Sequence, residues 1–92
     1  MNTMNEIQVM GAIDYALEEL FQGHDVSKNG ILNCLDMCCL GHLDWWDSMD
    51  YCQKIAVVHK ALKKLVKQKK VVSVRNGNNY RFQSARKPCH KS

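Results

Sequence analysis

Between Ser48 and Phe82 the spacing of apolar residues changes once. It changes from the three- and four-residue intervals that are typical of a helix to two short β-prone runs that are typical of a hairpin. Three- and four-residue intervals predict a helix that begins near Ser48 as N-cap and ends near Lys67 or Gln68. The expected core face of this helix consists of Tyr51, Ile55, Val58, Leu62, Leu65 and Val66. Two β-prone runs follow over residues 71–83. A helix that leads directly into a hairpin leaves few folds open to so short a chain.

The expected hairpin turns at Asn76, Gly77 and Asn78, which are all turn-forming residues. We expect these three residues to form the loop, because an odd loop places the apolar side chains of both strands on one face. The expected cross-strand pairs are Val74 with Tyr80 and Val72 with Phe82. The outward face would then carry Ser73, Arg75, Asn79 and Arg81.

Two further helices are predicted before Ser48. The first runs from about Asn5 to Phe21, and its apolar stripe consists of Ile7, Met10, Ile13, Leu17, Leu20 and Phe21. The second begins with Ser27 as N-cap and has three core residues, Ile31, Leu32 and Leu35. The segment 37–47 has no clear period, so it forms either a short helix with a loop or an ordered turn.

The chain of 92 residues has room for one domain with one modest core. We expect this domain to span residues 1–83 and a flexible basic tail to span residues 84–92. No stretch has the roughly 20 uninterrupted apolar residues of a membrane span, and the N-terminus has no signal-peptide pattern. The protein is therefore expected in the cytoplasm, or in the nucleus if its source is eukaryotic.

The cysteines and histidines show no recognisable catalytic or metal-binding pattern. There are five cysteines, an odd number, which favours free thiols over a complete set of disulfides. Cys34, Cys38, Cys39 and His42 are close in sequence, but their spacing matches no common zinc pattern. No motif joins a cysteine or serine nucleophile to a base. We therefore expect no metal, no cofactor and no enzymatic activity.

Charge is divided sharply between the two parts of the chain. All nine acidic residues lie before Lys54, together with one base, Lys28, so this part has a net charge of −8. The part from Lys54 onward contains twelve Lys or Arg and no acid, so its net charge is +12 and the whole chain has +4. Bases without interleaved acids leave the positive charge locally unneutralised, which favours a polyanionic partner.

The order of helix, short link, helix, turn, amphipathic helix and hairpin resembles the winged helix-turn-helix family over residues 5–83. The most specific stretch is KIAVVHKALKKLVKQKKVVSVRNGNNYRF, which looks like the family's recognition helix running into its wing. The resemblance implies a mostly α fold with three main helices and a C-terminal two-stranded wing. It also implies that the helix of residues 49–67 enters the major groove of DNA while the hairpin contacts backbone or minor groove.

The expected function is that of a small protein that binds double-stranded DNA, as a transcriptional regulator encoded by a virus or mobile element. Lys and Arg side chains on the helix and hairpin would displace counterions from phosphates. Gln53 and Lys54 are the candidates for base edges, since recognition helices point their N-terminal part into the groove. The candidate DNA-binding residues are Gln53, Lys54, Lys60, Lys63, Lys64, Lys67, Arg75 and Arg81.

Two other binding functions remain open. The acidic, aromatic segment 36–50 suggests a winged-helix module that binds or inhibits another protein. Trp45 and Trp46 would then anchor the contact, although one of them could instead close the core. Binding of structured or single-stranded RNA would use the same charges, but the sequence shows no exposed aromatic platform for bases.

We also expect a homodimer, because one recognition helix and a short wing offer few base contacts. The first helix is the expected contact, since it has apolar residues beside its core stripe: Val9, Ala12, Tyr15 and Ala16.

Overall fold

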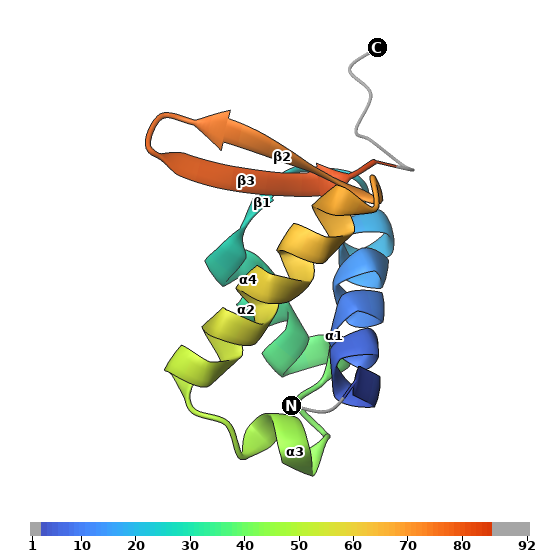
Figure 1. Cartoon of the computed structure of the whole chain (residues 1–92), viewed down its shortest axis with the longest axis vertical. Helices are drawn as coiled ribbons and strands as arrows, with labels where there is room; N and C mark the ends of the chain where they lie inside the picture. The colour runs from blue at the N-terminus through green and yellow to red at the C-terminus, as the bar shows by residue number, and fades with distance from the viewer. Residues whose placement is uncertain (1–2, 86–92) are drawn as a thin grey trace.

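The structure is a computed structural model that describes residues 3–85. It is mostly helical, with a small antiparallel sheet of three strands laid across one end of the helices (Figure 1). The elements are α1 (Thr3–Tyr15), η1 (Ala16–Leu20), β1 (Val26–Ser27), α2 (Lys28–Cys34), η2 (Leu35–Cys39), α3 (Asp44–Asp47), α4 (Tyr51–Lys67), β2 (Val71–Asn76) and β3 (Asn79–Ser84). None of the helices in this part of the chain combines the length and apolarity needed to cross a membrane.

The first helix is confirmed, but its buried face is not the predicted one. It continues without a break from α1 into η1, a π-helical turn that ends where the N–H of Phe21 bonds to the carbonyl of Ala16. Its fully buried residues are Val9, Ile13, Ala16 and Leu17, whereas Ile7 and Leu20 are exposed. Val9 and Ala16 belong to the core, so the prediction that they form a dimer surface is wrong.

The second helix begins as predicted. The Ser27 hydroxyl accepts a hydrogen bond from the N–H of Gly30, and Ile31, Leu32 and Leu35 are buried. A second π-helical turn, η2, follows α2. The chain then turns at Gly41, where a Cβ would lie 2.0 Å from the carbonyl oxygen of Asp36 and only glycine fits. The segment 37–47 thus contains the end of η2, a turn and the short helix α3.

Helix α4 begins two residues later than predicted. Its N-cap is Asp50, not Ser48, and Asp50 and Gln53 form a reciprocal capping box. It ends at Lys67 as expected. Its buried residues are Val58, Ala61, Leu62 and Leu65, with Ile55 and Val66 half-buried. Tyr51, predicted in the core, is exposed.

The hairpin has a different register from the predicted one. Asn76 pairs with Asn79, so the loop has two residues, and Gly77 adopts the positive φ of 64° that suits the first central position of such a turn. Val72 therefore faces Gln83, and Val74 faces Arg81. The predicted pairs are wrong, and Ser73 lies opposite Phe82.

The sheet also contains a strand that the sequence did not predict. The two residues of β1 pair with β3, so the strand order is β1-β3-β2. Val71 and Ser84, paired across the base of the hairpin, are both buried. Ser84 thus belongs to β3 and not to the predicted tail, whose residues 86–92 lie outside the described part.

Candidate nucleic-acid interface

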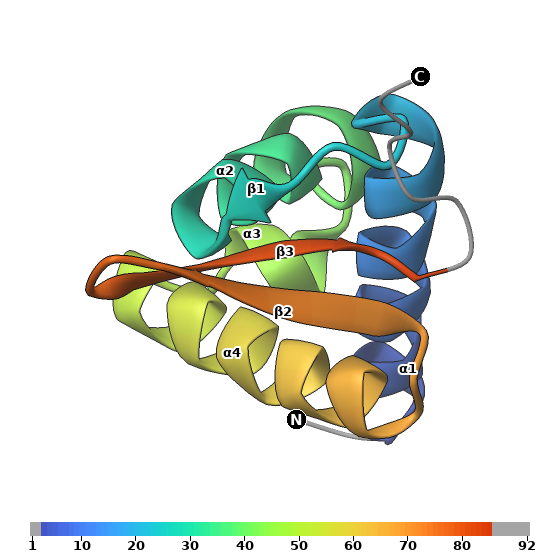
Figure 2. The same cartoon turned by 90° about the horizontal axis from the view of Figure 1, so that it is seen from above.

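A groove of about 790 Å³ lies between α4 and the hairpin, with the start of α2 contributing its third wall. Seen from above, the hairpin runs across α4 with its tip beyond the helices (Figure 2). The groove is lined by Ser27, Lys28, Asn29, His59, Leu62, Lys63, Val66, Lys67, Ser73, Asn78, Asn79, Tyr80, Arg81 and Phe82. Leu62, Val66 and Phe82 are its apolar lining, and the remaining side chains are polar or cationic.

The charge of the groove has one sign. Four of its lining residues are Lys or Arg and none is Asp or Glu: Lys28 comes from α2, Lys63 and Lys67 from α4, and Arg81 from β3. Arg81 is partly neutralised, because its Nε donates to Asp25 Oδ2 at 2.8 Å. The structure gives no acidic partner to the three lysines within residues 3–85. An anion in the groove would meet all three.

His59 lines the groove beside Lys28. The Lys28 ammonium donates to His59 Nδ1, with 3.3 Å between the nitrogens. Burial and then the charges of Lys28 and Lys63 lower the pKa of His59 below its ordinary value. These causes favour the neutral imidazole, whose Nδ1 can accept from Lys28.

The predicted DNA-binding residues fall into three groups. Lys63, Lys67 and Arg81 line the groove. Lys60 and Arg75 are exposed but lie outside the groove lining, and Arg75 Nε donates to the Gly77 carbonyl at 3.1 Å. Lys64 belongs to the same second group outside the groove lining, and it forms an ion pair with Glu6 of α1. Gln53 and Lys54 form the third group, at the start of α4.

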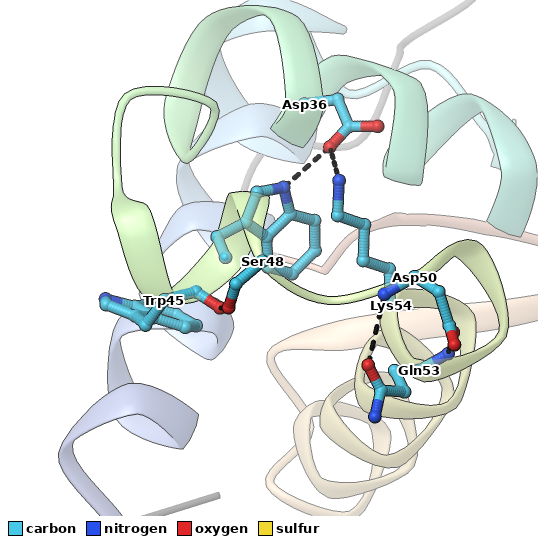
Figure 3. Close-up of polar contacts among 7 residues, drawn as sticks. Asp36, Trp45, Ser48, Asp50, Gln53 and Lys54 are labelled. Carbon is cyan, nitrogen blue, oxygen red and sulfur yellow. Dashed lines mark hydrogen bonds and ion pairs between the residues drawn. The ribbon is translucent and has the colours of Figure 1, made fainter.

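The start of α4 is occupied by structural contacts (Figure 3). Lys54 Nζ lies 2.9 Å from Asp36 Oδ1 and 5.4 Å from the centre of the Trp46 ring, and the Lys54 side chain is only 13% exposed. Trp46 Nε1 donates to the same Asp36 oxygen at 2.6 Å. Gln53 is held in the capping box. Gln53 and Lys54 thus form contacts within the protein, and their role as contacts to base edges stays a prediction.

The assumption that the basic half is unneutralised is also wrong in part. Three of its bases, Lys54, Lys64 and Arg81, pair with acids of the first half: Asp36, Glu6 and Asp25. The segregation of charge along the sequence is reduced by folding, since α4 packs against α1 and α2. Of the bases without an acidic partner within residues 3–85, three line the groove (Lys28, Lys63 and Lys67) and four lie outside its lining (Lys60, Lys69, Lys70 and Arg75).

Sequence reasoning missed three groove residues, Lys28, His59 and Tyr80. Lys28 is the one base in the acidic half, and it follows the N-cap Ser27, so its position beside α4 depends on tertiary packing. His59 is exposed on α4 and was not among the expected site residues. Tyr80 was predicted to share a face with Val74, and the two-residue turn places it opposite Arg75.

The predicted protein-interaction residues are only partly accessible. Trp46 is fully buried, so it is a core residue and not an interface anchor. Trp45 is half-buried and packs edge-on against it, with ring centres 6.2 Å apart. Tyr15 is exposed. The homodimer stays a prediction, with Tyr15 as the exposed member of its proposed surface.

Comparison with known proteins gives no relative for this chain. No model of a protein family matches it, no curated protein matches it, and no solved structure matches it.

Proposed function

We propose that this chain is a small winged-helix module that binds double-stranded DNA through the groove between α4 and the hairpin. The observation that carries the proposal is the lining of this groove, which contains Lys28, Lys63, Lys67 and Arg81 and no acid. Three of these cations, Lys28 of α2 and Lys63 and Lys67 of α4, have no acidic partner within residues 3–85. Such a convergence is costly in a free protein, because like charges repel one another. A phosphate backbone removes this repulsion and releases its own counterions.

The arrangement of elements supports the winged-helix assignment. The helix order and the hairpin after the longest basic helix agree with the pattern that the sequence resembles, whereas β1 is an addition to it. The hairpin then takes the place of the wing, and α4 takes the place of the recognition helix. A role as a transcriptional regulator follows if binding is sequence-selective.

The acids near the start of α4 argue for contact through its middle and last turns. Asp44 and Asp47 of α3 and the N-cap Asp50 are exposed, and they would repel phosphates that approached this end. Lys63 and Lys67 lie further along, beneath the hairpin. We therefore place the DNA backbone between α4 and the hairpin, with the start of α4 outside the contact.

The test is the salt dependence of binding to a labelled duplex, measured by fluorescence anisotropy. Affinity should fall linearly on a log–log plot as salt increases, and Lys63→Ala should weaken binding and reduce the slope by about one unit. Lys60→Ala is the matched control, because Lys60 is exposed on the same helix outside the groove lining. Absence of binding at low salt, or equal effects of the two variants, would contradict the proposal.

A further inference from the structure

Tyr80 is a large aromatic side chain that the fold does not use. It lies on β3 opposite Arg75, lines the groove and is 56% exposed. Within residues 3–85 its hydroxyl has no hydrogen-bond partner and its ring has no aromatic neighbour. Phe82, two residues along the same face, is half-buried against the core. Phe82 thus has a packing role that Tyr80 lacks.

The neighbours of Tyr80 in the groove are those of a nucleotide site. Lys63 and Lys67 provide the charge that a phosphate requires, and Asn78 of the turn adds an amide that can donate to and accept from a base edge. The groove volume of about 790 Å³ is within the usual range of sites that enclose small ligands. An exposed ring in the same groove as these cations is suited to stack on a base.

We propose that the groove binds an unpaired base, stacked on Tyr80, with the phosphates of its strand along Lys63 and Lys67. This inference rests on the proposed function and specifies its ligand further. A base inside a duplex has both faces covered by its neighbours, so it offers no face to Tyr80. A base at a single-stranded extension, bubble or bulge has a free face, and stacking on an aromatic side chain tolerates any base. The preferred ligand is therefore DNA with a single-stranded region beside the duplex.

The experiment compares a blunt duplex, the same duplex with a short single-stranded extension, and the single strand alone, each of about 15 nucleotides. Wild type should bind the extended duplex more tightly than the blunt one. Tyr80→Ala should weaken binding to the extended duplex and to the single strand by about ten-fold or more. Its affinity for the blunt duplex should change little. Because no charge is removed, its salt slope should equal that of wild type.

Two further variants separate stacking from damage to the hairpin. Tyr80→Phe retains the ring and should bind all three ligands like wild type. Val74→Ala removes an exposed apolar side chain from the opposite face of the same hairpin and should also leave binding unchanged. Circular dichroism of each variant reports on folding.

The outcomes separate this inference from the proposed function. Binding of the blunt duplex with no preference for the extension and no effect of Tyr80→Ala would overturn this inference alone. Absence of binding to every ligand at low salt would overturn both. Equal losses on blunt and extended duplexes in Tyr80→Ala would also overturn the stacking of an unpaired base.

Discussion

Asp36 connects three elements through one carboxylate oxygen. It lies in η2, accepts a hydrogen bond from Trp46 of α3, and pairs with Lys54 of α4. Burial opposes ionisation of Asp36, but the hydrogen bonds from Lys54 and Trp46 outweigh it and keep the pKa below its ordinary value. No periodicity in the sequence indicates this contact, because its partners are ten and eighteen residues away.

Asp36→Ala should lower the free energy of unfolding by about 1 to 3 kcal/mol, because it leaves the Trp46 Nε1 group without an acceptor. Asp36→Asn is the control, since its amide oxygen can still accept from Trp46 while the charge facing Lys54 is lost. Asp36→Asn should lower the free energy of unfolding by less than Asp36→Ala does, because the ion pair between Asp36 and Lys54 is partly exposed. Urea denaturation of both variants measures the difference. Equal stability of wild type and Asp36→Ala would show that this contact does not hold α3 against α4.

The Asp36 contact also gives an acid dependence of stability. Since its folded pKa is lowered, the stabilisation from the charge is fully present above the ordinary value of 3.8 and is lost as the pH falls through the folded pKa. The difference in stability between wild type and Asp36→Asn should therefore shrink below about pH 4.

His59 should make binding of DNA depend on pH. Burial, Lys28 and Lys63 lower the pKa of His59 in the free protein, and a phosphate between the lysines would offset their charge and raise the pKa again. Binding then takes up a proton, so affinity should increase as the pH falls from about 7.5 to 5.5. His59→Gln should lose this increase while it binds at pH 7.5 much as wild type does. Anisotropy titrations at constant ionic strength provide the measurement, and the same pH profile in both proteins would contradict the linkage.

Among the elements, the extent and the buried face of helix α4 could be predicted from the sequence. For helix α1 only the extent could be predicted. The large apolar residues of α4 form one narrow face opposite most of its lysines. The residues that periodicity predicts for the core are therefore the ones that are buried or half-buried, with the exception of Tyr51 in the first turn. Those of α1 and η1 are spread around the helix, from Met4 and Ile7 to Val9 and Ala16. Only packing against α4 selects which of them are buried. Sequence periodicity cannot make that selection.

The hairpin register was predicted wrongly for a related reason. The prediction assumed that the whole length of the hairpin covers the core, and that Val72, Val74 and Phe82 face it together. In the structure the hairpin tip extends past the helices (Figure 2), and Val72 and Val74 are exposed. Burial therefore determines the strand register only at the base of the hairpin, where Val71 and Ser84 are buried. The two-residue turn at Gly77 completes the register.

The adjacent valines Val71 and Val72 test this register. Val71 is 2% exposed and Val72 is 41% exposed. Val71→Ala should lower the free energy of unfolding by about 2 kcal/mol, through lost burial and the remaining cavity. Val72→Ala should change it by no more than about 0.5 kcal/mol. Chemical denaturation of the two variants decides the matter, and the reverse order of effects would support the three-residue loop.

In the whole molecule, folding pairs part of the acidic half with part of the basic half and leaves the acids of α3 apart from the cations of the groove. The acidic helix α3 and the sheet lie at opposite ends of α4 (Figure 1), and the groove with Lys63 and Lys67 lies at the sheet end. The sequence indicated a basic helix and a basic hairpin. It could not indicate that Lys28 joins them, or that Lys54, Lys64 and Arg81 pair with acids, because those contacts depend on how the helices pack.

The central claim is that nucleic acid occupies the groove between α4 and the hairpin. A titration of isotope-labelled protein with a DNA duplex that has a single-stranded extension, followed by amide chemical shifts, tests it most directly. The largest shifts should fall on Lys28, His59, Lys63 and Tyr80 and their neighbours, while the amides of Asp44 and Asp47 of α3 should not shift. Shifts confined to α3 and the start of α4, or no shifts at low salt, would contradict it.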